Sequence, residues 1–293
     1  LNATNEILLD MTFLEGNLTT GHRTSIRSGL PTPTWRKLYG GVQPTKSRAV
    51  QVTDNTGMME DYSEVDKALI DMAGNPAAFR LQEDRPHIEG MNQEFASTLF
   101  YGDESTAPEE FTGLSARYNS LSAENGDNII NGGGSGSDNA SVWLICWGPN
   151  TCHGIIPKGS MAGVQQRDLG EVTLENADGA NGRMQAYRTH YRWDVGLSVR
   201  DWRYAVRIAN IDRSALTYNA ASGAIINDLM HQAWTELPST SAGRCAWYMD
   251  KSILSMLRRQ TSSAVSSSTL SVDMVGGTMQ TSWGGIPIRR CDA

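Results

Sequence analysis

The longest run of regularly spaced apolar residues lies between Pro76 and Tyr101. Asn75-Pro76 places a proline at the first helical position, where its missing amide hydrogen is tolerated, and Gly102 ends the pattern. One helical face of this segment carries Ala77, Leu81, Ile88, Met91, Phe95 and Leu99. The pattern predicts a helix about 39 Å long, at about 1.5 Å per residue. Pro86 must kink this structural spine or divide it in two.

Strict alternation of apolar and polar residues marks the strongest strand signal. From Tyr187 to Val199 the odd-numbered residues are mostly aromatic or apolar, and the phase flips at Arg200-Asp201 so that even-numbered residues up to Ile208 become the apolar set. This pattern predicts a two-stranded ribbon with one buried face and one face rich in arginine, with a turn or bulge at the flip. The six-residue apolar run Val142–Trp147 predicts a buried strand rather than a membrane span.

A polar ribbon precedes the long helix. Residues Trp35–Val52 read as two strands joined at a Gly40-Gly41 turn, with too few apolar residues to form a core of their own. Such a ribbon needs a surface to lie on, and another copy of the chain could provide it. Before it, Leu1–Leu30 lacks sustained periodicity and should be extended or poorly ordered unless bound. After it, Ser63 is a plausible N-cap of a helix that ends near Gly74.

The C-terminal part alternates helices with short strands. Ile225–Leu237 and Asp250–Arg259 read as amphipathic helices around the apolar strand Cys245–Met249. The serine-rich interval Thr261–Ser271 reads as a loop. The chain closes on a strand, 284–290, which Pro287 confines to a sheet edge or a bulge because proline lacks the amide hydrogen that a ladder needs.

Composition narrows the function classes. The 293 residues are 39% hydrophobic and 19% charged, as expected of a folded globular protein, and the net charge of −7 argues against sequence-independent nucleic-acid binding. Four scattered cysteines favour a reducing cytoplasm over a disulfide framework. Arginine outnumbers lysine 20 to 5. Both a preference for arginine at interfaces and host codon bias account for that ratio.

The residues offer little catalytic chemistry. Cys146, Cys152 and His153 are close in sequence, but their spacing is not a zinc pattern. The loop Gly132–Gly136 is rich in glycine and serine and predicts a flexible connector, without the lysine that follows a phosphate-binding loop. No nucleophile-elbow motif occurs. We therefore predict no catalytic residue, no cofactor and no metal ligand. The alternative left open is a metal- or nucleotide-dependent enzyme that uses these residues.

The order of the elements resembles a known family. An arm, a polar ribbon, a long helix, a β ribbon and a closing mixed α/β region resemble the major capsid proteins of tailed bacteriophages, which have the Hong Kong 97 fold. The resemblance to the short-tailed branch of epsilon-fifteen and Bordetella phage rests on the stretches 33–36 (PTWR), 64–66 (EVD), 91–95 (MNQEF), 99–102 (LFYG), 141–144 (SVWL) and 204–210 (YAVRIAN).

This resemblance implies an α+β fold and a division of the chain. The expected parts are an N-terminal arm (1–30), an E-loop (31–61), a peripheral domain (62–140) with the spine helix (76–101), a probable axial segment (141–182), a peripheral β ribbon (183–214) and a mainly axial domain with the C-terminal strand (215–293). The implied function is structural and non-catalytic: self-assembly into hexamers and pentamers of an icosahedral head, often first as a procapsid. The implied location is the virion, with assembly in the host cytoplasm.

The resemblance also implies partners and contact residues. The implied partners are other copies of the chain, scaffolding and portal proteins, cement or decoration proteins, and packaged double-stranded DNA contacted non-specifically, with no membrane. The expected inter-subunit residues of the E-loop are Trp35, Arg36, Lys37, Tyr39, Gly40, Gly41, Lys46 and Arg48, those of the arm are His22, Arg23 and Arg27, and the β-ribbon arginines expected in ion pairs are Arg188, Arg192, Arg203 and Arg207. Some family members link an E-loop lysine covalently to an asparagine of a neighbour. Lys37 and Lys46 both lie off the Gly40-Gly41 turn, so we predict no such link.

Overall fold

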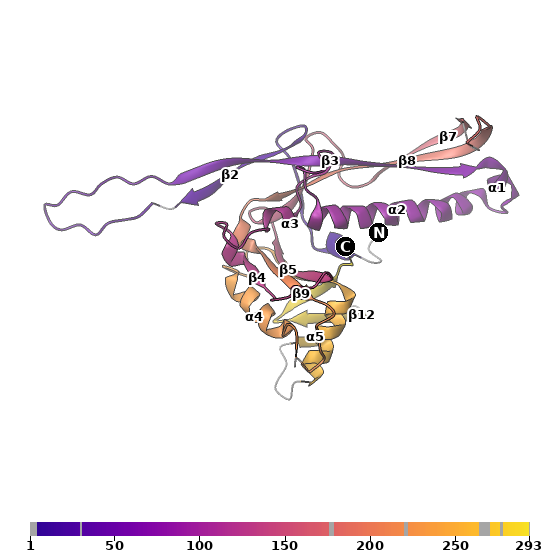
Figure 1. Cartoon of the computed structure of the whole chain (residues 1–293). Helices are drawn as coiled ribbons and strands as arrows, with labels where there is room; N and C mark the ends of the chain where they lie inside the picture. The colour runs from indigo at the N-terminus through magenta and orange to yellow at the C-terminus, as the bar shows by residue number, and fades with distance from the viewer. Residues whose placement is uncertain are drawn as a thin grey trace.

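The computed structural model describes residues 5–29, 31–175, 179–219, 222–263, 270–275 and 278–292. A long, narrow limb of strands and one helix crosses the top of the molecule, and a smaller lobe of strands and helices hangs below it (Figure 1). The limb ends on one side in the loop of residues 31–47 and on the other in a hairpin beside a short helix. The expected mixture of helices and strands is confirmed.

Four strands form the sheet of the limb: β2 (Gly21–Gly29), β3 (Arg48–Asp66), β7 (Gln165–Glu175) and β8 (Arg183–Val199). The N-terminal half of β3 pairs antiparallel with β2, from Gly21↔Asn55 to Gly29↔Arg48. Its C-terminal half pairs antiparallel with β8, from Thr56↔Gly196 to Asp66↔Ala186, and β7 lies along β8. One 19-residue strand thus joins the outstretched hairpin to the rest of the limb.

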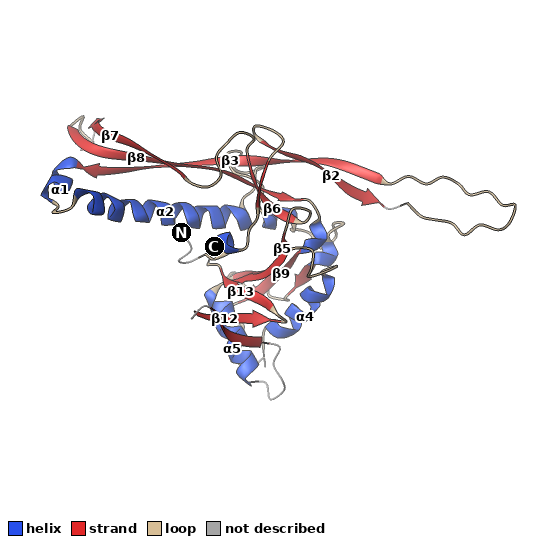
Figure 2. Ribbon diagram, turned by 180° about the vertical axis from the view of Figure 1, so that it is seen from behind, coloured by secondary structure: helices blue, strands red, loops and turns tan. Residues whose placement is uncertain are grey.

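The predicted spine helix is confirmed as α2 (Pro76–Tyr101), which runs along the sheet of the limb (Figure 2). Its N-cap is Asn75, whose side chain accepts a hydrogen bond from the amide of Ala78, and Pro86 does not divide it. Phe95 is fully buried, with its ring 4.6 Å from that of Trp193 on β8. Packing of this apolar face, rather than local propensity, stabilises so long a helix.

The lobe is built around β5 (Asn139–Trp147), which confirms the buried strand expected there. Strand β5 lies between β9 (Ala205–Asp212) and β10 (Arg244–Met249). The sheet continues through β4 (Ile129–Asn131) beside β9 and through β13 (Ile286–Arg290), β12 (Thr278–Trp283) and β11 (Leu270–Val275) beyond β10. The predicted helices are α4 (Ile226–Glu236) and α5 (Lys251–Ser263), which pack against this sheet.

Strand β5 belongs to two hydrophobic cores at once. Trp143, Ile145 and Trp147 point into the core shared with α2, whereas Val142, Leu144 and Cys146 point into the core under α4 and α5. Strand β10 alternates in the same way, with Tyr248 in the first core and Trp247 in the second. Period-two geometry sends successive side chains to opposite faces, so both faces of the central sheet are covered.

Short elements complete the fold. They are η1 (Ile7–Leu9), β1 (Phe13–Glu15), α1 (Lys67–Met72), α3 (Leu114–Arg117), η2 (Gly126–Asn128), β6 (Cys152–Ile156) and η3 (Trp202–Tyr204). The N-terminal segment is bound to the subunit rather than poorly ordered. Strand β1 pairs parallel with β6, and buried Asp10 accepts hydrogen bonds from Arg289 on β13 at 2.7 and 3.1 Å.

Two predictions about the ribbon and the helix after it are wrong. The described residues 31–47 contain no strand, and the partner of β3 comes from the segment 21–29 that we expected to be an arm. Pro31, Pro33 and Pro44 lack the amide hydrogens that a ladder requires. Ser63 is not an N-cap but a buried β3 residue opposite Thr189, because pairing with β8 continues to Asp66. Asp66 caps α1 instead, accepting from the amide of Ala68.

The two alternating segments 187–199 and 202–208 do not pair with each other, which corrects the predicted ribbon. Strand β8 pairs with β3, β6 and β7, whereas β9 pairs with β4 and β5. The amides of Arg200 and Asp201 both donate to the carbonyl of Thr151, and η3 follows at once. The phase flip therefore marks the point where the chain leaves the limb and enters the lobe.

The closing strand is not an edge strand, because β13 lies between β12 and β10. Its pairing with β12 ends at Pro287 and its pairing with β10 begins at Ile288, so the residue without an amide hydrogen stands where the strand changes partners. The predicted loop Thr261–Ser271 is shorter than expected, since α5 reaches Ser263 and β11 begins at Leu270. Residues 264–269 lie outside the described part of the chain.

Candidate assembly surfaces

The loop of residues 31–47, here called the tip loop, carries most of the predicted E-loop contact residues. Trp35 and Tyr39 are as exposed as in an extended peptide, and Leu38 is 88% exposed. The tip loop contains Arg36, Lys37 and Lys46 and no acidic residue. Large side chains held this far from any core add nothing to the stability of the isolated subunit. Large apolar side chains that are exposed without benefit to the monomer are typical of an interaction site.

The tip loop turns at Lys37–Gly40 rather than at Gly40-Gly41. The amide of Gly40 donates to the carbonyl of Lys37 at 3.0 Å, and Tyr39 has a φ of 63°. A positive φ is costly for a bulky residue. Lys37 is therefore the first residue of the turn. The expectation that no covalent link forms cannot rest on Lys37 lying away from the turn. Gly41 follows the turn, and Arg48 is the first residue of β3.

The three residues predicted on the arm lie on β2, the first strand of the hairpin. The ring of His22 accepts a hydrogen bond from the amide of Asn17 at 3.3 Å, and the guanidinium of Arg23 donates to the hydroxyl of Thr53 on β3 at 3.2 Å. The side chain of Arg27 is outside the described part of the chain. His22 and Arg23 thus stabilise the hairpin, and their contact with another subunit stays a prediction.

Three of the four predicted arginines make ion pairs within the chain. Arg188 pairs across strands with Glu64, Arg192 pairs with Asp194 at 3.0 Å, and Arg203 pairs with Asp201 at 2.8 Å. Arg207 contacts no carboxylate in the described part of the chain. It donates to the carbonyl of Tyr118 at 2.8 Å and lies 5.3 Å from the ring centre of Trp143, and burial lowers its pKa.

A buried polar cluster at the root of the hairpin escaped prediction. Asp54 of β3 is 3% exposed; it pairs with Arg117 at 2.8 Å and accepts a hydrogen bond from Ser198 of β8 at 2.7 Å. His153 of β6 is 1% exposed, and its ring meets that of His22 edge-on at 5.9 Å. This cluster fixes the root of the hairpin to the rest of the subunit. No local pattern reveals it, because its residues come from five separate segments.

His153 should make the subunit sensitive to acid. Burial, together with the nearby His22, lowers the pKa of the His153 ring from 6.5 to about 4. The unfolded chain therefore binds more protons than the folded one between these values. The contribution of neutral His153 to the free energy of unfolding is fully present above pH 6.5. It is lost as the pH falls from 6.5 to about 4, and the total loss is about 3 kcal/mol.

Urea unfolding of wild type and His153→Phe at a series of pH values measures this effect. The phenyl ring cannot be protonated, so the variant should lose that part of the pH dependence. The charged groups that face His153, namely His22, Asp54 and Arg200, are present in both proteins, so the two proteins differ only in the side chain at position 153. Equal pH slopes for the two proteins would contradict the assignment.

The alternative of an enzyme that uses Cys146, Cys152 and His153 gains no support from the described residues. Cys146 and Cys152 are completely buried, and burial raises the pKa of Cys152 to about 12. A thiol that stays protonated is neither a nucleophile nor a metal ligand. Among the described residues, no group of three or more His, Cys, Asp and Glu side chains could hold a metal ion. Nor does any described helix have the length and hydrophobicity to cross a membrane.

The glycine-rich loop is fixed to the sheet rather than free to bind phosphate, which corrects the prediction of a flexible connector. The amides of Gly132 and Gly134 donate to the carbonyls of Ala209 and Asn210 on β9, at 2.7 and 2.8 Å. The amide of Gly133 donates to the side chain of Asn131. These three amides are the groups that would have to face a phosphate, and all are occupied.

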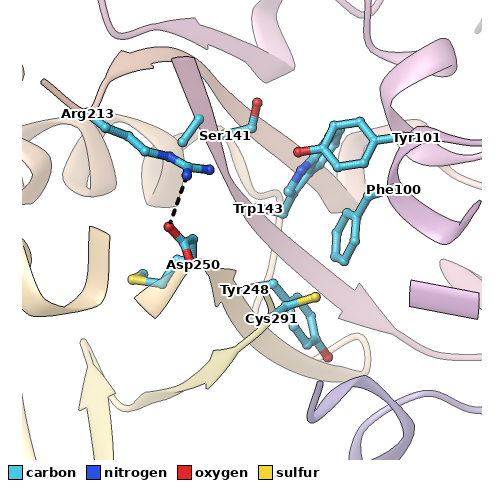
Figure 3. Close-up of a pocket in the computed structure, with 10 residues that line it drawn as sticks. Phe100, Tyr101, Ser141, Trp143, Arg213, Tyr248, Asp250 and Cys291 are labelled. Atoms are coloured by element: carbon cyan, nitrogen blue, oxygen red, sulfur yellow. Dashed lines mark ion pairs between the residues drawn. The ribbon is translucent and has the colours of Figure 1, made fainter. Parts of the chain in front are cut away.

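A small pocket lies between the limb and the lobe. It is lined by Phe100, Tyr101, Trp143, Tyr248 and Cys291, and Arg213 and Asp250 face each other across it at 3.6 Å (Figure 3). Its volume is about 20 Å³, which is room for roughly one water molecule. A cavity of that size holds no substrate.

Comparisons with known proteins identify the family of the chain. A family model described as major capsid protein GP7 matches residues 1–293. A solved structure from bacteriophage Epsilon15 is 37% identical, with a TM-score of 0.73, and the match covers 100% of this chain and 88% of that one. The capsid of a native GTA particle is 8% identical, with a TM-score of 0.49 and coverage of 71% and 91%. No curated protein matches the chain.

Proposed function

Because the chain belongs to the GP7 family of phage major capsid proteins, we propose that it closes into icosahedral shells of hexamers and pentamers around double-stranded DNA. As a member of that family it is a structural shell protein with the Hong Kong 97-type fold, and it self-associates in the shell of the virion. The proposal is that the subunits form capsomers of five and six, that the shell contains double-stranded DNA, and that the protein has no catalytic function. Packaging partners, namely scaffolding, portal and cement proteins, belong to the same proposal.

The observation that carries the proposal is the exposed tip loop on an otherwise well-packed subunit. Its three largest apolar side chains, Trp35, Leu38 and Tyr39, reach no core in their own chain. Residues of these types lose most from exposure and gain most from burial at an interface. The hairpin that bears them reaches away from the lobe and thereby brings them within range of an adjacent copy (Figure 1).

Electron microscopy and sedimentation of the purified protein test the proposal. We expect closed shells, or capsomers of five and six subunits, from the protein expressed alone or together with the other virion proteins of its phage. A stable soluble monomer under both conditions would overturn it. Packaged DNA should be released by dissociating the shells in high salt, since contacts to phosphate without base readout weaken steeply with ionic strength.

We expect the shells to be held together without covalent links. Lys37 and Lys46 are both exposed on the tip loop, and residues 31–47 contain no carboxylate that could act as a base to activate either side chain as a nucleophile. Boiled shells should therefore give one band of about 32 kDa on a denaturing gel, with the Lys37→Arg variant as the control. A ladder of covalent oligomers that the control lacks would contradict this prediction.

A further inference from the structure

The fold sorts the four cysteines of the chain, all of them buried thiols, into two cores. Cys152 and Cys291 lie in the core shared with α2, whereas Cys146 and Cys245 lie in the core under α4 and α5. Cys146 of β5 stands directly opposite Cys245 of β10 in the antiparallel pair of strands. Side chains that stand opposite each other on one face of a sheet are neighbours, so these two thiols form a cross-strand pair.

The main-chain groups of both residues point away from the partner strand. Met249 on β10 accepts a hydrogen bond at its carbonyl from the amide of Cys291, just beyond β13, at 3.0 Å. Main-chain groups alternate in direction along a strand, so those of Cys245, four residues earlier, also face β13. The carbonyl of Cys146 faces away from β10, because it accepts from the hydroxyl of Thr151, which precedes β6 on the other side of β5, at 2.7 Å. Cys146 and Cys245 are therefore a non-hydrogen-bonded pair.

A pair of this kind has the spacing that a disulfide needs. Opposite residues in a non-hydrogen-bonded pair have Cα atoms about 4.5 Å apart, against about 5.5 Å in the hydrogen-bonded kind. A disulfide spans Cα separations of roughly 4.4–6.8 Å, so it can join β5 to β10 without a change of register. A hydrogen bond with the Cys146 thiol also lowers the pKa of Cys245, which favours the reactive thiolate.

The cysteine pair lies close to the surface of the lobe. Cys245 is 8% exposed, and Gly243, two residues earlier, is exposed. A Cβ atom placed on Gly243 would stand 3.4 Å from the sulfur of Cys146, so only this short segment separates the pair from solvent. A small oxidant therefore has a short path to Cys245.

We propose that Cys146 and Cys245 are a redox-controlled cross-strand disulfide, reduced while the chain is made inside a cell and closed by a peroxide once the virion is outside. A cell interior keeps thiols reduced, whereas disulfides persist at virion surfaces. The inference goes beyond the proposed function, because both cysteines belong to one subunit and need neither capsomers nor cargo.

The reaction has two steps. The Cys245 thiolate attacks one oxygen of hydrogen peroxide, which gives a sulfenic acid at Cys245 and releases hydroxide. The sulfur of Cys146 then attacks the sulfenic sulfur and forms the S–S bond, while the proton of Cys146 leaves with the hydroxyl group as water. The hydroxide takes up the proton that Cys245 lost. In total the two thiols lose two electrons, and one peroxide becomes two water molecules.

Peptide mapping of peroxide-treated wild-type protein tests the proposal directly. The sample is alkylated while it is denatured and is then digested with chymotrypsin, which cleaves after Trp147 and so separates Cys146 from Cys152. Mass spectrometry should show the Cys146 and Cys245 peptides linked, and dithiothreitol should separate them. Met161 is 71% exposed, and its sulfoxide reports that the peroxide has reacted. Alkylated Cys146 and Cys245 beside oxidised Met161, or a sulfinic acid at Cys245 without a link, would overturn the proposal.

Thermal unfolding supplies an independent test. The disulfide would close a loop of about 100 residues, so oxidised wild type should unfold about 5 °C above the same sample reduced with dithiothreitol. Cys245→Ala should lose both the shift and the linked peptides, whereas the matched control Cys291→Ala removes another buried thiol and should keep both. An equal shift in the two variants would refute the link. If Cys245→Ala does not fold, the peptide map of wild type still decides. Failure of the proposed function is distinguishable, because a protein that forms no shells gives the same map.

Discussion

Replacing residues 30–47 with Asn-Gly is expected to leave a folded subunit that forms no closed shells. Gly29 and Arg48 are paired in the sheet, so a two-residue turn can join their strands without altering the register. None of residues 31–47 belongs to a hydrophobic core. The free energy of unfolding should therefore change little, whereas the surface that reaches the neighbouring copy is removed entirely.

Two measurements on the same preparation separate these effects. Thermal unfolding monitored by circular dichroism should give nearly the wild-type midpoint, and electron microscopy should show no closed particles. Thr45→Ala keeps the length of the tip loop and its aromatic and basic residues, so this control should assemble like wild type. Closed shells of the shortened variant in normal yield would show that the tip loop is dispensable.

Asp54→Ala is expected to destabilise the subunit by about 3 kcal/mol. Asp54 is nearly inaccessible, and its loss leaves the guanidinium of Arg117 without its counter-charge at the root of the hairpin. Arg117 keeps hydrogen bonds to the carbonyls of Thr112 and Leu197, which places the effect at the lower end for a broken buried pair. Ser198 loses its partner as well.

The matched control is Asp168→Ala, which breaks the pair between Arg80 and Asp168 on the surface of the limb. The side chain of Asp168 is 54% exposed, so we expect a loss of at most about 1 kcal/mol. Urea unfolding of dilute, unassembled subunits, followed by tryptophan fluorescence, compares the two variants. Equal losses for both would show that the buried cluster does not anchor the hairpin.

The elements with local signals were predictable from the sequence. Helix α2 begins and ends where Asn75, Pro76 and Gly102 indicate, since capping chemistry and proline geometry act within a few residues. Strand β5 follows from an apolar run too short for a membrane span and flanked by polar residues. Helices α4 and α5 appear within a few residues of their expected positions.

Long-range pairing was not predictable. Residues 21–29 gave no strand signal because most of their side chains are polar, and their strand exists only because β3 lies beside them. Pairing with β8 likewise extends β3 through Ser63, which the local sequence predicts as the N-cap of a helix. Alternation identified two strands near residue 200, yet could not reveal that they belong to different parts of the sheet.

The candidate site was predictable only in part. The exposed character of Trp35 and Tyr39 follows from a segment with too few apolar residues for its own core, but its purpose came from the resemblance to capsid proteins. Glu109-Glu110 reads in sequence as an ordinary solvated pair. Only the fold brings Glu109 and Glu110 beside Glu94 of α2 and Met58 of β3.

The shared strands β5 and β10 determine how a shell of this protein can change curvature. Their side chains alternate between two cores, so twisting the lobe against the limb would open one core to water whichever way it turned. The limb and the lobe of a subunit built in this way should therefore move as one rigid body. In the proposed shells, we therefore expect differences in the angle between neighbouring subunits to be taken up at the tip loop rather than within the subunit.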